Sequence, residues 1–289
     1  MNWSVSTGNG RCVSIAKPPA PSKENDVNAD EISVVVPAFN AALFVTRTLD
    51  TVASQTVRPR EVIVADDGST DDTVQVIEHW ALEHPQLVVR VLRCPHRGPG
   101  AARNAAIREA TGAWIAFLDS DDLWRPEKVE RVTAFLSSNP TLNFVCHGEE
   151  HLRLDGTADS VDYSELYDPK QRLAPQLFRH NLFSTSAVVC SRQLLLTAGL
   201  FDETLMSAQD YEMWLRVAPS IHVGFISAAL GTYVERVGNI TRGSIAQRRR
   251  NHLAILKRYR AYVGAPLYWR AALVVRASAA KQYLRRSFG

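Results

Sequence analysis

The sequence lacks any uninterrupted run of 18 or more apolar residues, so we predict no transmembrane helix among its 289 residues. Its beginning also lacks a basic stretch followed by an apolar stretch, which argues against a secretory signal peptide. The sequence also has no large excess of one charge, since its 33 Lys and Arg residues nearly balance its 30 Asp and Glu residues. The resulting net charge of +3 gives no global field for nucleic acid, and we expect no nucleic-acid partner.

Cysteine is scarce and dispersed. Four cysteines are present, Cys12, Cys94, Cys146 and Cys190, and none forms a pair with zinc-finger or CxxC spacing. The eight histidines are scattered too, without metal-ligand spacing. We therefore expect reduced, mostly buried thiols and a cytoplasmic protein rather than a disulfide-stapled secreted one.

What the sequence does contain is an alternation of strand and helix patterns. Apolar, β-branched runs at 32–37, 61–65, 87–92, 113–118 and 143–146 predict strands, and segments with helical apolar spacing lie between them. This order predicts an α/β fold with a doubly wound, mostly parallel sheet over 31–146. Residues 1–30, rich in Ser, Asn, Gly and Pro, are predicted to be a disordered leader.

The second half of the chain has a different rhythm. Residues 147–172 are polar and are predicted to be loop-like, and short strands are predicted at 184–190, 223–226 and 232–234. Helices are expected at 193–198 and 210–217. We interpret 147–243 as a mixed, acceptor-side half of one domain spanning 31–243. Residues 244–289 form a basic helical tail that either contacts an anionic membrane face or packs on the domain as a solvated helix.

Three carboxylates follow the strand at 113–118. Asp119, Asp121 and Asp122 stand at its carboxyl end, where open α/β sheets bind ligands. One or two such carboxylates, together with phosphate oxygens, can hold a divalent cation. The alternative is a turn with a helix cap. Asn40 and Asp67 also follow predicted parallel strands, so all these side chains should meet at one cleft.

Several motifs occur together in a familiar order. They are Val34-Val-Val-Pro-Ala-Phe-Asn40, Val62-Ile-Val-Ala-Asp-Asp-Gly-Ser-Thr70, Gly98-Pro-Gly-Ala-Ala-Arg-Asn104, Phe117-Leu-Asp-Ser-Asp-Asp122, Ser184-Thr-Ser-Ala-Val-Val189, Gly199-Leu-Phe-Asp202 and Gln209-Asp210. Over about residues 32–236 the chain resembles the family 2 glycosyltransferases, which have the GT-A fold. The resemblance implies inverting sugar transfer from a nucleotide-sugar donor with a divalent cation, Mn²⁺ or Mg²⁺.

The resemblance also implies donor contacts. Four consecutive residues would line the nucleoside: Pro37, Ala38, Phe39 and Asn40. Asp67 would accept a hydrogen bond from the base, the alternative being a turn or cap role. Gly98 would allow close backbone approach, and Arg103 would reach the donor phosphates or brace the acidic cluster.

In the same family pattern, Asp121 would be the direct metal ligand. Asp119 would bind the ribose or the water molecules around the metal, and Ser120 between them belongs to the donor site. We expect Asp122 to cap a helix. Asp210 would be the general base that removes a proton from the acceptor hydroxyl, the alternative being a helix N-cap.

Two departures from the family pattern stand out. Gln209 replaces an acidic residue that often precedes the base, and no His occurs at 233–241. Either Arg236 or Arg242 contacts the diphosphate instead, or one side chain holds the metal. These departures keep a catalytically silent nucleotide-sugar-binding scaffold open as an alternative, and a metal-dependent nucleotidyltransferase is the nearest competing enzyme. A Rossmann dehydrogenase is disfavoured, because Gly98-Pro-Gly100 is followed by Arg103 where that fingerprint needs Gly.

The expected reaction is transfer from a UDP-sugar to a glycan or lipid-linked acceptor in cell-surface polysaccharide synthesis. Peripheral contact with the cytosolic face of a membrane would involve 244–289.

Overall fold

The computed structural model describes residues 27–236 and 245–288. Most of the predicted leader, and Arg242 of the predicted diphosphate contacts, lie outside the described residues. The nine strands are β1 (Ile32–Ala38), β2 (Glu61–Asp66), β3 (Val89–Arg93), β4 (Trp114–Phe117), β5 (Leu123–Trp124), β6 (Phe144–Leu152), β7 (Ala158–Val161), β8 (Val188–Ser191) and β9 (Val223–Val234). They form one sheet in the order β3-β2-β1-β4-β8-β6-β9-β5, with β7 paired to β6.

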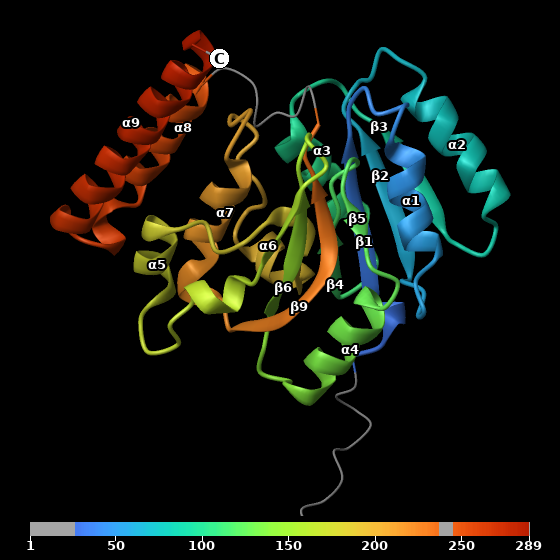
Figure 1. Ribbon diagram of the computed structural model, residues 1–289. Coiled ribbons are helices and arrows are strands. Elements are labelled where there is room, and N and C mark those ends of the chain that lie inside the picture. Colours follow the sequence, from blue (N-terminus) through green and yellow to red (C-terminus); the bar gives the residue numbers. More distant parts are fainter. Residues whose placement is uncertain (1–26, 237–244, 289) are drawn as a thin grey trace, which may run out of the picture.

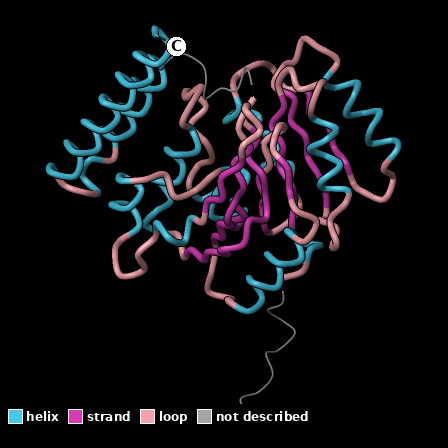
Figure 2. The backbone as a smooth tube through the Cα atoms, in the orientation of Figure 1, coloured by secondary structure: helices cyan, strands magenta, loops and turns pink. Residues whose placement is uncertain are grey.

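The helices surround this sheet (Figure 1). They are α1 (Val45–Ala53), α2 (Thr73–Glu83), α3 (Pro99–Glu109), α4 (Lys128–Ser138), α5 (Leu173–Arg179), α6 (Arg192–Thr197), α7 (Gln209–Val217), α8 (Ile245–Arg258) and α9 (Ala265–Phe288). The tube view in Figure 2 shows the strands gathered in the middle, with helices on both flanks.

The first half of the sheet is parallel, as the sequence predicts. β1 lies between β2 and β4, and Val34 pairs with Val62 on one side and Ala116 on the other. β3 extends the parallel order beyond β2. Because parallel strands share one carboxyl edge, the loops that follow β1, β2, β3 and β4 are collected at that edge.

The second half is mixed, and here part of the sequence prediction is wrong. The whole segment 147–172 was predicted to be loop-like. Residues 147–152 instead continue β6, and β7 pairs with this last part of β6. The two short strands predicted at 223–226 and 232–234 are one strand, β9, which runs parallel to β6. A polar segment becomes a strand here because β9 and β7 supply its backbone partners, which local composition does not reveal.

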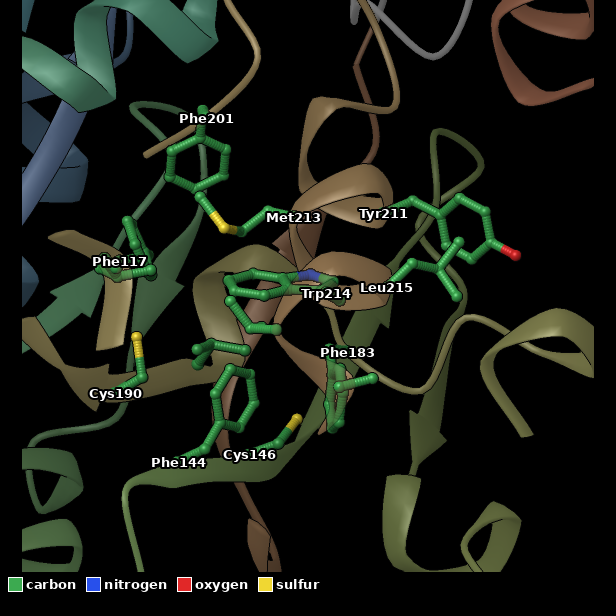
Figure 3. Packing of buried hydrophobic residues seen from close by; sticks show 14 of the residues in the cluster. Phe117, Phe144, Cys146, Phe183, Cys190, Phe201, Tyr211, Met213, Trp214 and Leu215 are labelled. Atoms are coloured by element: carbon green, nitrogen blue, oxygen red, sulfur yellow. The ribbon is translucent and has the colours of Figure 1, made fainter. Parts of the chain in front are cut away.

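Two hydrophobic cores cover the two faces of the sheet. Alternation along β1 sends Val34 and Val36 to the core beneath α1, α2 and α4, and Val35 to the core that contains α3 and α7. Figure 3 shows the second core, where Trp214 of α7 lies among the rings of Phe117 on β4, Phe144 on β6 and two loop phenylalanines, Phe183 and Phe201. Its ring meets Phe144 edge-on, with the centroids 5.2 Å apart. This aromatic packing fixes α7, which carries Gln209 and Asp210, against the sheet.

The two C-terminal helices pack on the rest of the molecule rather than extending from it. Ile255 and Leu256 of α8 and Ala271 of α9 are buried in the second core. In Figure 1 they form a pair beside α5 and α7. Across the described ranges, none of the helices combines the length and apolar character needed to cross a membrane.

Candidate active site

The loops that follow β1 and β2 at the carboxyl edge are tied together by hydrogen bonds. The amide of Asp67 donates to Ala38 O at 2.8 Å, and the amide of Thr70 donates to Asn40 Oδ1 at 2.9 Å. Asn40 has φ +48°, in the left-handed region that Asn tolerates better than most residues. Asn40 does not cap the next helix, because α1 begins only at Val45 and has Phe44 at its N-cap. Asn40 instead shapes the loop predicted to line the nucleoside.

Asp67 is buried at the centre of these loops. Its carboxylate accepts hydrogen bonds from the amides of Gly98, at 2.9 Å, and Arg97, at 2.8 Å. His96 Nδ1 lies 2.9 Å from the same carboxylate, and its ring stacks on Phe39 with centroids 4.3 Å apart. Asp67 therefore joins the loop after β2 to the start of α3, which holds two of the predicted donor residues, Gly98 and Arg103, in one frame.

Arg103 of α3 forms an ion pair with Asp119. Of the two predicted roles for Arg103, bracing the acidic cluster is therefore seen directly. The guanidinium is almost fully buried, and its Nε and Nη1 have no hydrogen-bond partner among the residues that the structure describes. A buried, charged donor is costly to leave unpaired, but these two nitrogens have almost no exposed surface, so a ligand would reach them only after neighbouring side chains had moved.

Asp121 pairs with a residue distant in sequence. Its Oδ2 accepts a hydrogen bond from Arg236 Nε at 2.6 Å, and the guanidinium lies over the ring of Phe44, 3.9 Å from the centroid. Burial raises the pKa of Asp121, the Asp119 carboxylate raises it further, and Arg236 lowers it. Arg236 thus contacts the predicted metal ligand itself.

Asp122 has a different role from the one predicted. Glu127 occupies the N-cap of α4, so the helix-cap expectation is wrong. Asp122 instead accepts hydrogen bonds from Ser186 Oγ at 2.6 Å and from the amide of Val234 at 3.0 Å. Burial, with the nearby Asp119, Asp121 and Glu149 charges, raises the pKa of Asp122 well above its usual value. It joins the acidic loop to β9.

Ser186 is a structural centre that the sequence analysis missed. Its Oγ accepts a hydrogen bond from the amide of Asp119 at 3.0 Å, and its carbonyl accepts one from the buried ammonium of Lys128 at 2.8 Å. Burial lowers the pKa of Lys128 well below its usual value, although Glu149 opposes this. The Ser184-Thr-Ser motif was visible in the sequence, and three hydroxyl residues just before an apolar strand were the available signal.

Asp210 lies in the first turn of α7 and is not its N-cap, a position that Ala208 occupies. Thr185 Oγ1 donates to Asp210 Oδ2 at 3.2 Å. Since Ser186 follows Thr185 and contacts Asp119, two adjacent residues connect the predicted base to the acidic loop. Gln209 is buried beside Gly100 of α3, and its Oε1 lacks a hydrogen-bond partner within the described ranges.

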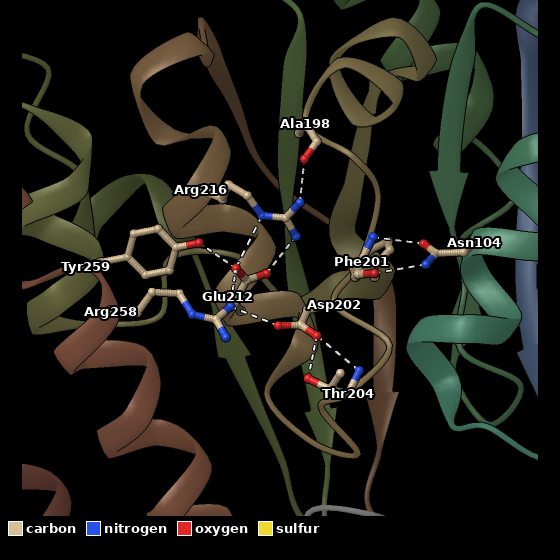
Figure 4. A network of polar contacts seen from close by, with 9 residues as sticks. All are labelled: Asn104, Ala198, Phe201, Asp202, Thr204, Glu212, Arg216, Arg258 and Tyr259. Carbon is tan, nitrogen blue, oxygen red and sulfur yellow. Dashed lines mark hydrogen bonds and ion pairs between the residues drawn. The ribbon is translucent and has the colours of Figure 1, made fainter.

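A second polar network holds α7 in place (Figure 4). Buried Glu212 accepts hydrogen bonds from Arg216 on its own helix and from Arg258 and Tyr259 of the C-terminal region. Asn104 of α3 makes reciprocal hydrogen bonds with the backbone of Phe201. No short-range pattern marks these partners, because they join residues up to 97 positions apart.

Asp119 and Asp121 suit a divalent cation that takes only one or two protein carboxylates as ligands. In the described part of the chain, no three His, Cys, Asp or Glu side chains are grouped as a metal cage. Mg²⁺ and related cations, however, bind through one or two carboxylates plus substrate phosphates. Asp119 and Asp121 are close enough for one charge to raise the pKa of the other, and a cation would relieve that repulsion.

The fold and the arrangement of the acidic loop define a GT-A glycosyltransferase architecture. A solved structure of S. aureus TarS 1-349 in complex with UDP-GlcNAc has a TM-score of 0.64 at 23% identity, covering 78% of this chain and 66% of that one. The mannosyltransferase PcManGT from Pyrobaculum calidifontis, in complex with GDP-Man and Mn²⁺, has a TM-score of 0.60 at 24% identity, over 86% and 69% of the two chains. These likenesses establish the fold, and they confirm the predicted fold class.

The family is established by sequence. The profile of Glycosyl transferase family 2 matches residues 33–187, more than half of the chain, so the chain belongs to that family. The chondroitin synthase of Escherichia coli is 30% identical over 198 residues, which are 68% of this chain and 28% of that protein. The hyaluronan synthase of Pasteurella multocida is 32% identical over 187 residues, or 65% and 18%. The chain therefore spans less than a third of the length of these curated relatives.

Proposed function

We propose that the protein transfers a sugar from a nucleotide-sugar donor to an acceptor hydroxyl. The observation that carries this proposal is the acidic loop, in which Asp119 and Asp121 lie close together and each is paired with an arginine. In a family 2 glycosyltransferase fold, such a group suits a divalent cation and the diphosphate of a donor. Membership of the family and the GT-A fold support the same reaction class.

The donor would lie across the carboxyl edge of the parallel strands. Residues 37–40 would line the nucleoside. Asp67, whose carboxylate already accepts hydrogen bonds from two amides, would accept a further hydrogen bond from the base. Asp121, with Asp119, would hold Mn²⁺ or Mg²⁺, which supplies charge neutralisation for the leaving diphosphate. Arg236, which contacts Asp121, would exchange that carboxylate for the donor phosphates, where the family pattern often has His. A UDP donor is favoured because a carboxylate suits the N3–H of uracil.

Asp210 would act as the general base. Inversion requires the oxygen of the acceptor hydroxyl to attack opposite the leaving group while it loses its proton. A fixed carboxylate can take up that proton. Thr185 orients the Asp210 carboxylate through its 3.2 Å contact, and the aromatic core holds α7. Because residue 209 is Gln, the residue directly before Asp210 carries no negative charge that would repel its carboxylate. The contact that orients this carboxylate is the hydrogen bond from Thr185.

The acceptor is a glycan or a lipid-linked glycan, and the pathway is cell-surface polysaccharide synthesis. The similarity to chondroitin and hyaluronan synthases supports this assignment. We place the reaction on the cytosolic face of a membrane, with peripheral contact through α8 and α9. The basic and apolar residues of these helices support that placement.

The test is a thermal-shift panel of UDP- and GDP-sugars with Mn²⁺, followed by a nucleotide-release assay. A true donor raises the melting temperature, since it binds only the folded state. Asp210→Asn should lower UDP release about 100-fold or more, which is the usual contribution of a general base. Glu83→Gln, the same chemical change on the exposed face of α2, should leave release unchanged.

Three other outcomes would contradict this function. Donor binding without any release identifies the silent scaffold. Pyrophosphate formation from a nucleoside triphosphate and a sugar phosphate identifies the nucleotidyltransferase. Equal melting temperatures with every nucleotide sugar, with and without Mn²⁺, would remove the basis for the donor site.

A further inference from the structure

A cavity of about 480 Å³ lies beside α7, and it is not formed by the acidic loop. Its walls come from the end of α5, from Tyr211 of α7, and from α8 and α9. It therefore lies on the side of α7 where the C-terminal helices pack. The predicted donor residues do not line it, so the donor site gives no account of this cavity.

The inner part of the cavity is apolar. Leu177, Phe178, Leu256 and Ala271 line it and are buried. Helix α9 contributes residues at helical spacing, among them Leu267, Ala271, Val274, Val275 and Ser278, so one face of this helix is directed at the cavity. Val274 remains 55% exposed, which places it where the apolar lining reaches the surface. This lining suits a hydrocarbon chain rather than a carbohydrate.

The cavity wall also carries a cluster of positive charges. Four arginines from three helices contribute to the walls: Arg179, Arg248, Arg249 and Arg270. None of the cavity's lining residues, all in the described part of the chain, is acidic. Arg179 also donates to Gln171 at 2.8 Å, which steadies its guanidinium. Arginine clusters are suited to phosphate, because the planar guanidinium binds its oxygens in pairs.

The cavity adjoins the predicted base. Tyr211 directly follows Asp210, and its ring stacks on His252 of α8 with centroids 4.5 Å apart. Burial lowers the pKa of His252, and the charge of Asp210 acts in the opposite direction. His252 therefore lies within electrostatic reach of Asp210, and a ligand in the cavity would be close to the acceptor side of the reaction.

We propose that this cavity binds the phosphate-bearing head and the adjoining hydrocarbon of a lipid-linked acceptor. The arginines would take the phosphate, and the apolar lining would take the first part of the chain. Trp269 and Leu273, which are 59% and 66% exposed on the same helix, do not line the cavity and lie on the other side of α9. The inference rests on the proposed sugar transfer, because it assigns the acceptor of that reaction.

Vesicle sedimentation with the full chain tests the proposal. One set of phosphatidylcholine vesicles carries a polyprenyl phosphate, and a second set carries phosphatidylglycerol at the same surface charge. We expect tighter binding to the polyprenyl phosphate vesicles. A soluble short-chain prenyl phosphate should compete, whereas inorganic phosphate at the same concentration should not, which separates a lipid phosphate from free phosphate.

Two matched pairs of variants locate the site. Arg270→Glu should weaken binding to the polyprenyl phosphate vesicles about tenfold or more, as expected for a lost charge-assisted contact. Arg276→Glu makes the same change on α9 outside the cavity and should keep the preference for polyprenyl phosphate. Val274→Gln should remove that preference, whereas Leu273→Gln should not. The second pair decides the question if Arg270→Glu fails to fold.

Equal binding to both vesicle sets would overturn the proposal, as would equal effects of the two variants in each pair. Such results would indicate general attraction to an anionic surface. They would leave the sugar-transfer proposal standing, provided that the wild-type chain still releases nucleotide from a donor sugar. A chain that neither binds nor consumes any nucleotide sugar would instead overturn the proposed function.

Discussion

Asp121 and Arg236 show how one side chain can change the chemistry of a site at the residue scale. Both are partly buried, with side-chain exposures of 16% and 32%, and their ion pair occupies a carboxylate predicted to bind a cation. An arginine here neutralises Asp121 when no metal is bound. The Arg236 guanidinium must release Asp121 before this carboxylate can bind a metal ion with both oxygens free.

Substituting Arg236 by Ala should therefore strengthen metal binding. We expect Mn²⁺ to bind about three- to tenfold more tightly without donor, since a partly exposed ion pair contributes about 1 kcal/mol. The signal of free Mn²⁺ in electron paramagnetic resonance measures this affinity. Arg125→Ala, which breaks the 2.6 Å pair with Glu150, is the control and should cause no change. Unaltered affinity in Arg236→Ala would mean that Asp121 is not a metal ligand.

At the scale of elements, the carboxylate of Glu61 adds side-chain hydrogen bonds to the pairing of β2 with its neighbours. Glu61 Oε1 accepts hydrogen bonds from Ser33 of β1 at 2.8 Å and from the amide and hydroxyl of Thr111, both at 2.7 Å. Gly112 follows, and a Cβ there would lie 2.5 Å from Glu31 O, so the turn before β4 needs glycine. These contacts fix the ends of three adjacent strands opposite the active site.

Stability at acid pH should depend on Glu61. Burial raises its pKa, but the bonds from Thr111, Ser33 and Arg90 outweigh burial, and the pKa lies below the usual 4.5. The stabilisation is therefore complete above that value and is lost as the pH falls through the folded-state pKa. Glu61→Gln should lower the free energy of unfolding at neutral pH by about 1–3 kcal/mol. It should also flatten the acid dependence.

Urea unfolding at neutral and acid pH measures both effects. Glu165→Gln, at an exposed position in the loop after β7, should reproduce the wild-type profile. An acid profile of Glu61→Gln as steep as that of the wild type would show that other carboxylates control this transition.

The elements themselves were largely predictable, because local patterns determine them. Buried β-branched runs predicted β1 and β2, and the Asp cluster after β4 marked the edge of the sheet. The polar residues of β6 misled the prediction, since their strand conformation depends on pairing with β9 across more than 70 residues. Asp122 misled it as well, because its amide partner lies 112 residues away.

At the scale of the whole molecule, the C-terminal helices are integrated with the core. Glu212 is 1% exposed and receives contacts from Arg258 and Tyr259, which anchor the end of α8 to α7. Burial and Glu212 raise the pKa of Tyr259 to about 12, so its hydroxyl remains a donor at neutral pH. The cavity proposed for a lipid-linked acceptor depends on this docking.

Tyr259→Phe should loosen that docking. We expect the free energy of unfolding to fall by about 1–3 kcal/mol, because a buried carboxylate loses a hydrogen bond. Amides of α8 should also exchange faster with deuterium than those of β1. Tyr262→Phe, the same change at a less buried tyrosine three residues later, is the control. Equal stability of the two variants would show that apolar packing alone anchors the helices.

The sequence alone determined the order of strands and helices, the acidic residues at strand ends and the resemblance to a family. These follow from residue type and short-range spacing, on which backbone preference and burial depend. Only the tertiary structure decided which partner each carboxylate has: Arg103 for Asp119, Arg236 for Asp121 and Ser186 for Asp122. Such pairs join residues 16 to 115 positions apart, and only packing brings them within hydrogen-bond distance.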